Sequence, residues 1–422
     1  MAKKGIFVIM KIRESLEFLL AIIKNPELLK ISRLKASAFT RNRSMGFSDA
    51  LCFMLDMRKT TIQTRLNMFF RHVKGGTPIS QPAFTKLRSQ FSHKPFEVMM
   101  RELVKEEYSG KYETPLWNGY VALAVDGSYL QLPTTPELAV EFGVRGAGNR
   151  PSAGISVLYD VLHGWVLDAE IDGTDRNERH ALARHIDFLK RDLPHVAKKT
   201  LLLADRGYPS YELLEKCEEN GLKYVMRCSS QSFRFANDAP LGDVCATLEN
   251  GRIVRVVKFT LNSGEVETLV TNLFDVPENE FPELYAMRWG IETLYHELKR
   301  KVGVEKFSGK TPNSVRQDFW ASLVLLLQIA VFQKEADAMV AERRKANPRK
   351  RQYRARTSDL IVILRDRFIF AALCDIPVLK QIELNDVLRE LSRAVSPVRP
   401  GRSFPRVPKP CAAANPFLKS AL

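Results

Sequence analysis

The chain has 422 residues, of which 45% are hydrophobic and 27% charged, a composition typical of a globular protein rather than a disordered or fibrous one. Its formal net charge of +16 indicates a polyanionic partner, either nucleic acid or an anionic membrane surface. The best apolar run, residues 319–332, is shorter than the roughly 20 residues of a membrane-spanning helix, and residues 5–23 do not have the pattern of a signal peptide. Six scattered cysteines without a Cys-x-x-Cys pair indicate neither a zinc site nor a disulfide framework, so we expect a cytosolic protein.

The basic residues are concentrated in three segments. Residues 1–44, 342–356 and 396–422 carry net charges of +7, +7 and +5, which leaves −3 for the rest of the chain. One charged run by itself is more often a solvated surface than a binding site. Here, however, basic segments flank a slightly acidic body. This division indicates that the basic segments bind a polyanion and that the acidic body contains the reactive site. The proline-rich segment 396–422 is predicted to be extended or flexible.

The first 118 residues are predicted to be helical. Apolar residues spaced by three and four predict helices over 14–24, 48–55, 61–70 and 95–108. A further helix is predicted within 79–88, where the Ser80 cap and Pro82 precede Lys86 and Arg88 on its exposed side. This segment is either a DNA-recognition helix or a plain surface helix, and the second interpretation is the simpler one.

From residue 121 the pattern changes to strands. The elements predicted next are, in order, strands 121–125, 155–162 and 165–171, helix 177–191, strand 200–204, helix 210–220 and strand 223–227. His163-Gly164 has the spacing of a tight hairpin, and Thr174–Glu178 is interpreted as the N-terminal cap of the following helix. The apolar strand 200–204 is expected to be central in its sheet.

A segment with two β-rich runs follows, and then the chain returns to helix. We interpret the runs 252–261 and 267–273 as a small inserted sheet. Helices are predicted over 282–301 and 313–334.

Two aspartates occupy positions at the ends of predicted apolar strands. Asp126 and Asp205 each follow an apolar strand, where a carboxylate needs a partner, a cation or solvent. Because turns favour Asp, either residue taken singly has an ordinary structural explanation.

A third carboxylate lies on the predicted helix 282–301. At about 100° per residue, one arc of about 60° holds a polar set, Tyr285, Arg288, Glu292 and Lys299. The opposite side is apolar, so we expect the polar face to point outward from a docked helix. A solvated polar stripe would show the same periodicity. Together with the two aspartates, however, Glu292 predicts a site in which three carboxylates bind Mg²⁺ next to a phosphate.

The spacing Tyr, two residues, Arg, three residues, Glu, six residues, Lys resembles the signature of the DDE transposases of bacterial insertion sequences, in the family named for insertion sequence number four. Asp126 in Ala124–Ser128 and Asp205 in Ala204–Tyr208 also resemble the family's aspartate contexts, and the resemblance covers about residues 119–335. It implies three catalytic, metal-binding residues, Asp126, Asp205 and Glu292. It further implies three DNA-binding residues, Tyr285, Arg288 and Lys299.

The resemblance implies an α/β fold built around a ribonuclease-H-like catalytic core. The implied domains are a helical DNA-end-binding domain at 1–118, the catalytic domain at 119–335 with an inserted β subdomain at 230–281, a basic helical region at 336–395 and a flexible tail at 396–422. The insertion accounts for the separation of 87 positions from Asp205 to Glu292.

The implied activity is cut-and-paste transposition with two Mg²⁺ ions, for which Mn²⁺ substitutes. The implied partners are the terminal inverted repeats of the protein's own element, target DNA and a second copy of the chain in the synaptic complex, with no membrane partner. The implied location is the bacterial cytoplasm, in association with the nucleoid. The residues do not indicate whether a hairpin intermediate forms, whether Trp289 stacks on a displaced base or packs at a domain boundary, or whether Arg206 contacts DNA or braces Asp205.

Two alternatives remain. One is a catalytically silent DNA-binding regulator derived from a transposase, for which a lost carboxylate would be diagnostic, and all three carboxylates are present. The other is a structure-specific nuclease on the same fold, which would give no strand-transfer products. From the residues alone, the prediction is metal-dependent phosphoryl transfer on nucleic acid, with affinity that falls steeply as salt rises.

Overall fold

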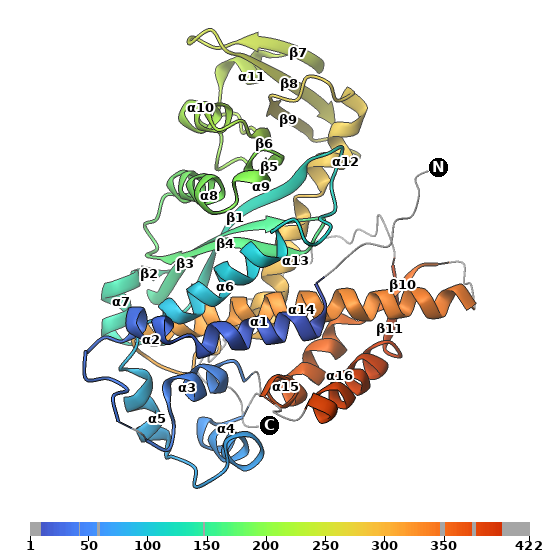
Figure 1. Cartoon of the computed structure of the whole chain (residues 1–422). Helices are drawn as coiled ribbons and strands as arrows, with labels where there is room; N and C mark the ends of the chain where they lie inside the picture. The colour runs from blue at the N-terminus through green and yellow to red at the C-terminus, as the bar shows by residue number, and fades with distance from the viewer. Residues whose placement is uncertain are drawn as a thin grey trace. The chain divides into compact units, whose positions relative to one another are not determined.

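The computed structural model describes residues 10–41, 43–56, 60–146, 148–346, 351–373 and 377–398 (Figure 1). The chain divides into two compact units. The sheet unit comprises Val104–Leu130 and Phe142–His296, and the helical unit comprises Met1–Leu103, Gln131–Glu141 and Glu297–Leu422. Most of the predicted flexible tail, residues 399–422, and part of the basic segments, 1–9 and 347–350, lie outside the described residues.

In the described part of the sheet unit, nine strands form one mixed sheet in the order β2-β3-β1-β5-β6-β9-β8-β7, with β4 paired to β3. The strands are β1 (Val121–Gln131), β2 (Val144–Arg145), β3 (Arg150–Asp160), β4 (Trp165–Asp172), β5 (Thr200–Ala204), β6 (Lys223–Arg227), β7 (Gly242–Thr247), β8 (Ile253–Thr260) and β9 (Val266–Thr271). This large central sheet confirms the predicted mixed α/β class.

The centre of the sheet is formed by apolar parallel strands. All five residues of β5 are buried, and so are the first five residues of β1. Strand β5 pairs in parallel with β1 on one side and with β6 on the other, so that Ala204 is level with both Val125 and Met226. The prediction that 200–204 is a central strand is therefore confirmed, and the chain leaves these strands at one edge of the sheet.

The described helical elements of the sheet unit are α8 (Glu178–Asp192), α9 (Pro194–Ala197), α10 (Tyr211–Glu219), α11 (Arg234–Asp238), the short 3₁₀ turn η2 (Glu278–Glu280), α12 (Phe281–Ala286) and α13 (Trp289–His296). Of these, α8 packs against β3 and β4, α10 against β6, and α11 against β9 (Figure 1). The Asn177 side chain accepts hydrogen bonds from the backbone N–H groups of Arg179 and His180. The predicted helix cap is thereby confirmed, and so is the β3–β4 hairpin, whose Gly164 adopts a φ of +78°.

The β-rich insertion is not a separate sheet. Strand β9 pairs antiparallel with β6, so β9, β8 and β7 extend the main sheet. The prediction of a small sheet of its own was wrong because the backbone of β6 offers hydrogen-bonding groups on its open side, and β9 satisfies them. Strand β7 was not predicted, since its sequence Gly-Asp-Val-Cys-Ala-Thr has few apolar residues and alternates between exposed and partly buried positions.

The single helix predicted over 282–301 is also interrupted. Helix α12 ends at Ala286, a turn occupies Met287 and Arg288, and α13 follows. The π-helical segment η3 (Glu297–Val302) comes next and belongs to the helical unit. The turn is closed by short-range bonds, including one from the Arg288 N–H to the Tyr285 carbonyl. Tyr285 and Arg288 are buried, so the outward-pointing polar face expected for this segment is not formed at these two residues.

The described elements of the helical unit are mostly helices. They are α1 (Ile12–Lys24), α2 (Pro26–Ser32), α3 (Phe47–Met54), α4 (Ile62–Phe69), the π-helical turn η1 (Phe70–Lys74), α5 (Gln81–Arg88), α6 (Lys94–Glu107, whose last turn enters the sheet unit), α7 (Pro136–Phe142), η3, α14 (Pro312–Ala346), α15 (Thr357–Leu373) and α16 (Pro377–Leu391), with the short strands β10 (Tyr353–Ala355) and β11 (Val395–Pro397). Helix α14 is long and apolar enough to cross a membrane, but 78% of its apolar window is buried within the protein. It packs against α1, α15 and α16, as a core helix does.

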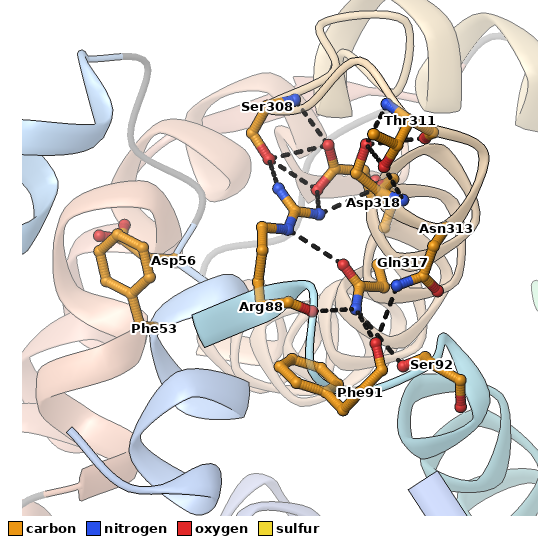
Figure 2. Close-up of polar contacts among 12 residues, drawn as sticks. Phe53, Asp56, Arg88, Phe91, Ser92, Ser308, Thr311, Asn313, Gln317 and Asp318 are labelled. Atoms are coloured by element: carbon orange, nitrogen blue, oxygen red, sulfur yellow. Dashed lines mark hydrogen bonds and ion pairs between the residues drawn. The ribbon is translucent and has the colours of Figure 1, made fainter. Parts of the chain in front are cut away.

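Helix α5 has the predicted Ser80 cap, but its two basic residues have different environments. Lys86 is exposed, whereas Arg88 is buried. Figure 2 shows the Arg88 guanidinium turned toward α14 and the loop before it, where it donates to Gln317, Ser308 and Asp318. The expectation that Arg88 lies on the exposed side of the helix was therefore wrong, because acceptors distant in sequence bind its guanidinium inside the unit.

Candidate active site

The two aspartates come from neighbouring parallel strands, Asp126 from within β1 and Asp205 from the position directly after β5. Val125 of β1 is level with Ala204 of β5, and each is followed directly by an aspartate, Asp126 and Asp205. Asp126 was expected to follow the end of its strand, but it lies within the strand, because β1 continues to Gln131. It lies instead at the level where β5 stops, so the parallel pairing brings both carboxylates to the same edge.

Asp126 is partly enclosed. Its Oδ1 accepts a hydrogen bond from the Gly127 N–H at 2.8 Å, and the Tyr295 hydroxyl donates to its backbone carbonyl at 2.6 Å. Burial raises the pKa of Asp126 to about 6, and the charges of Glu178 and Asp205 act in the same direction. The Gly127 N–H and the Arg288 guanidinium oppose this rise without cancelling it. The Asp126 carboxylate is thus short of positive charge, which is the environment that a cation stabilises.

Asp205 is contacted by two of the signature residues. The Tyr285 hydroxyl donates to Asp205 Oδ1 at 3.3 Å, and Arg288 Nη2 lies 3.9 Å from Asp205 Oδ2. Arg288 Nη2 also lies 3.3 Å from Oε1 of Glu292. Burial opposes the charge of Arg288, yet its pKa is raised because Tyr285 and the Asp205, Glu292 and Asp126 carboxylates together outweigh that effect. The structure therefore brings Tyr285, Arg288 and Glu292 together with Asp205.

The remaining predicted residues have more exposed positions. The Glu292 side chain is 34% exposed, so its carboxylate reaches solvent. Trp289 is 50% exposed, and its ring centroid lies 5.9 Å from Arg288 Cζ. Arg206 is exposed, and its backbone N–H donates to Asp205 Oδ1 at 2.7 Å. Lys299 lies outside the sheet unit, on η3, where it is partly buried.

Two residues that sequence reasoning missed belong to the same region. Arg227 Nη1 lies 3.9 Å from Asp205 Oδ1, and Arg227 Nε lies 3.4 Å from Oε1 of Glu267. Burial raises the pKa of Glu267, and the Arg227 charge opposes that rise. Arg227 ends β6, the next parallel strand, so its position at a carboxyl end was a usable signal. Glu267 had no such signal, because it comes from the insertion.

The donor chemistry of this edge suits a hard divalent cation. Carboxylate oxygens are the ligands that Mg²⁺ prefers, and Asp126 and Asp205 present them from adjacent strands. Within the described residues, however, no three His, Cys, Asp or Glu side chains are gathered closely enough to hold one metal ion. Arg288 binds between Asp205 and Glu292. The aspartate pair therefore fits such an ion, and the arginine holds Glu292 next to the pair.

Comparison with known proteins connects this edge to a family. The chain is 26% identical over 235 residues to the transposase InsG for insertion sequence element IS4 of Escherichia coli strain K12, over 50% of this chain and 51% of the relative. It is 22% identical over 231 residues to the InsZ protein of the same strain, over 52% of this chain and 75% of that protein. The chain thus spans about half the length of InsG.

A solved structure of a piggyBac transposase synaptic complex with hairpin DNA is also similar, with a TM-score of 0.49 and 13% identity over 94% of this chain and 87% of that chain.

The Transposase DDE domain profile matches residues 117–328, which is half of the chain and includes the aspartate pair and the whole Tyr-Arg-Glu-Lys signature. The chain therefore belongs to the DDE transposase family, in the type represented by insertion sequence IS4.

Proposed function

We propose that the protein is an active transposase that cleaves DNA at the ends of its own element and joins the freed 3′ ends to target DNA. One observation carries the proposal: Asp126 and Asp205 follow residues that are level on adjacent parallel strands, inside the family-matched segment. The retention of Glu292, linked to Asp205 through Arg288, favours an enzyme over a catalytically silent regulator.

The proposed catalytic core is the ribonuclease-H-like part of the sheet. The order β4-β3-β1-β5-β6, with β3 and β4 antiparallel and β1, β5 and β6 parallel, supports this assignment. We propose that β7, β8 and β9 are the inserted subdomain of 230–281. The domain roles predicted from the sequence complete the proposal, with 1–118 binding the element ends, and with the basic region 336–395 and the tail 396–422 contacting DNA.

The proposed cofactor is Mg²⁺, with Mn²⁺ as a substitute and two ions in the site. Asp126, Asp205 and Glu292 would hold the ions, which would activate the attacking water or 3′-hydroxyl and stabilise the leaving oxygen. The buried Arg288 orients the Asp205 and Glu292 carboxylates, and its positive charge limits their repulsion. Tyr285 positions Asp205 through its hydroxyl.

The proposed partners are the terminal inverted repeats, target DNA and a second copy of the chain in the synaptic complex, in the bacterial cytoplasm at the nucleoid. Lys299 and Arg288 are proposed to contact DNA phosphates, together with Arg227, which is 30% exposed at the same sheet edge. The half-exposed Trp289 offers a ring surface on which a base can stack.

The test compares the full-length protein with three amide variants, Asp126→Asn, Asp205→Asn and Glu292→Gln. The substrate is duplex DNA that carries the element end. Each variant should lose Mg²⁺- and Mn²⁺-dependent cleavage and strand transfer while retaining end binding in a gel-shift assay. Asp187→Asn serves as the control, because Asp187 is an exposed carboxylate on α8 that pairs with Lys216.

Full cleavage by any of the three amide variants would contradict the proposal. Cleavage by the wild-type protein without any strand-transfer product would favour the structure-specific nuclease, and end binding without cleavage would favour the regulator.

A further inference from the structure

Arg176 is a buried cation next to the aspartate edge. Its side chain is 3% exposed, and none of its three guanidinium nitrogens has a hydrogen-bond partner among the described residues. The side chain passes over two glycines: a Cβ added at Gly154 would lie 2.5 Å from Arg176 Cδ, and a Cβ added at Gly127 would meet its guanidinium. Because Gly127 follows Asp126 directly, Arg176 lies against the backbone that carries the first aspartate.

Glu178 joins this arginine to both aspartate segments. Its Oε1 lies 3.9 Å from Arg176 Nη2 and 2.5 Å from the position of a Cβ on Gly127. Its Oε2 lies 2.8 Å from the position of a Cβ on Gly207, two residues after Asp205. One carboxylate is thus placed against the backbone next to Asp126 and against the loop that follows Asp205.

A third contact fixes the same loop. Arg179 Nε donates to the Gly207 carbonyl at 3.2 Å. The N-terminal end of α8, held by the Asn177 cap, therefore approaches Gly207 through two side chains, those of Glu178 and Arg179. An arginine buried without hydrogen bonds is costly, and a purely structural cap at Asn177 does not require one there.

We propose that Arg176 and Glu178 are positioning residues that hold the Asp126 and Asp205 segments at the separation needed to bind the divalent cation. The inference rests on the proposed function, because it takes the aspartate pair to be the metal site. Residues that contact the metal-binding side chains without touching the metal set the position of those side chains. Losing one such residue typically weakens metal affinity by about 10- to 100-fold.

Two glycines provide a test that leaves every charge unchanged. Neither Gly127 nor Gly207 has a positive φ, so alanine is compatible with the backbone at both. The atoms that the new methyl group meets are the ends of flexible side chains, so Gly207→Ala should displace the Glu178 carboxylate, and Gly127→Ala should displace both Arg176 and Glu178. Gly148→Ala is the matched control, because its nearest neighbour would be 3.6 Å away, on the Arg150 side chain.

The experiment is calorimetric titration of the full-length protein with Mn²⁺ in the absence of DNA, together with melting temperatures. Glu178→Gln and Gly207→Ala should each weaken Mn²⁺ binding by about tenfold or more, while Gly148→Ala and Asp187→Asn leave it unchanged. Glu178→Asp, which keeps the carboxylate, should bind Mn²⁺ more tightly than Glu178→Gln does.

The double variant Arg176→Met/Glu178→Gln separates positioning from stability. It removes the buried cation together with its partner, so its melting temperature should recover relative to Glu178→Gln, while Mn²⁺ affinity stays low. Recovery of both would overturn the inference in favour of a purely structural pair, as would unchanged Mn²⁺ affinity in Glu178→Gln and Gly207→Ala.

Asp126→Asn and Asp205→Asn in the same titration separate this inference from the proposed function. If these two variants lose Mn²⁺ binding and Glu178→Gln keeps it, only the positioning role fails. If the two aspartate variants also keep it, the proposed metal site itself fails.

Discussion

The Nη2 nitrogen of Arg288 lies 3.3 Å from Oε1 of Glu292, four residues further along the chain, although only 4% of the Arg288 side chain is exposed. The same nitrogen lies 3.9 Å from Oδ2 of Asp205. One buried guanidinium therefore connects the carboxylate that follows a central strand with the carboxylate of α13. This contact makes Arg288 part of the acidic site as well as a candidate phosphate contact.

Arg288→Met should therefore impair both folding and cleavage. Its removal leaves two carboxylates repelling each other at a partly buried position, and we expect the free energy of unfolding to fall by about 1–2 kcal/mol. Arg288→Lys keeps the charge but loses the planar fork, so it should retain more stability than activity. Thermal melts and the cleavage assay check this, and equal stability of Arg288→Met and the wild type would contradict the proposed electrostatic role.

Asp126 should make the stability of the metal-free protein pH-dependent. Its pKa rises from an ordinary value of 3.8 to about 6 in the folded protein, so the native state binds more protons than the unfolded state between these values. The contribution of Asp126 to stability is therefore greatest below pH 4 and is lost as the pH rises through about 6. At about 1.4 kcal/mol per pKa unit, the cost above that pH is on the order of 3 kcal/mol.

Asp126→Asn removes this titration. The variant should melt at a higher temperature than the wild type at pH 7.5, and the difference should shrink toward pH 4. Melting curves over this range, recorded with a chelator present, check the prediction. A gap in melting temperature that does not depend on pH would show that burial of the Asp126 charge is not its cause.

Arg88 and Lys86 should separate stability from DNA binding on α5. Arg88 is 4% exposed and donates to Gln317 Oε1 at 3.0 Å and to Ser308 Oγ at 2.7 Å. Arg88→Met takes the guanidinium away from the buried Gln317 side chain and from the Asp318 carboxylate, and should lower the free energy of unfolding by about 2–4 kcal/mol. Lys86→Gln, on the exposed side, should leave stability unchanged. If α5 contacts DNA, Lys86→Gln lowers end affinity in gel shifts; unchanged affinity supports the plain surface helix.

The basic segment 342–356, which includes the last turn of α14, should determine part of the salt dependence of DNA binding. Three of its exposed arginines are available for substitution, Arg343, Arg351 and Arg354. Replacing them with Gln should reduce the slope of log affinity against log salt by up to about 0.9 for each DNA phosphate that is no longer neutralised. Arg234→Gln is the control, because Arg234 is 95% exposed on α11 and pairs with Asp238. An unchanged slope in the triple variant would exclude this region from the DNA-binding surface.

Several elements were predictable because their determinants are local. The run Thr200–Ala204 is entirely apolar, and it forms a strand that is buried between two parallel neighbours. The His163-Gly164 turn and the Asn177 cap depend on neighbouring residues only, and both are present. The spacing of Tyr285, Arg288, Glu292 and Lys299 is likewise a property of the sequence, and it identified the family before any contact was known.

The interrupted helix shows where local reasoning stops. Periodicity placed Tyr285 and Arg288 on an outward face, yet both are buried, because Asp205, which directly follows β5, pairs with Arg288 and accepts a hydrogen bond from Tyr285. Arg88 is a second case, since its acceptors lie more than 200 residues away. Glu178 is a third: its place as a helix N-terminus was readable, but its contact with Gly207 was not.

The sequence by itself determined the central strands, the helix caps, the spacing of the acidic and basic residues and the family, because each follows from the order of side chains along the chain. Only the tertiary structure decided which charges are buried together: Arg288 with Asp205 and Glu292, and Arg176 with Glu178. The physical reason is that a charged group leaves water only where an opposite charge or a hydrogen-bonding group from elsewhere in the chain compensates it, and strand pairing across the sheet sets those distances.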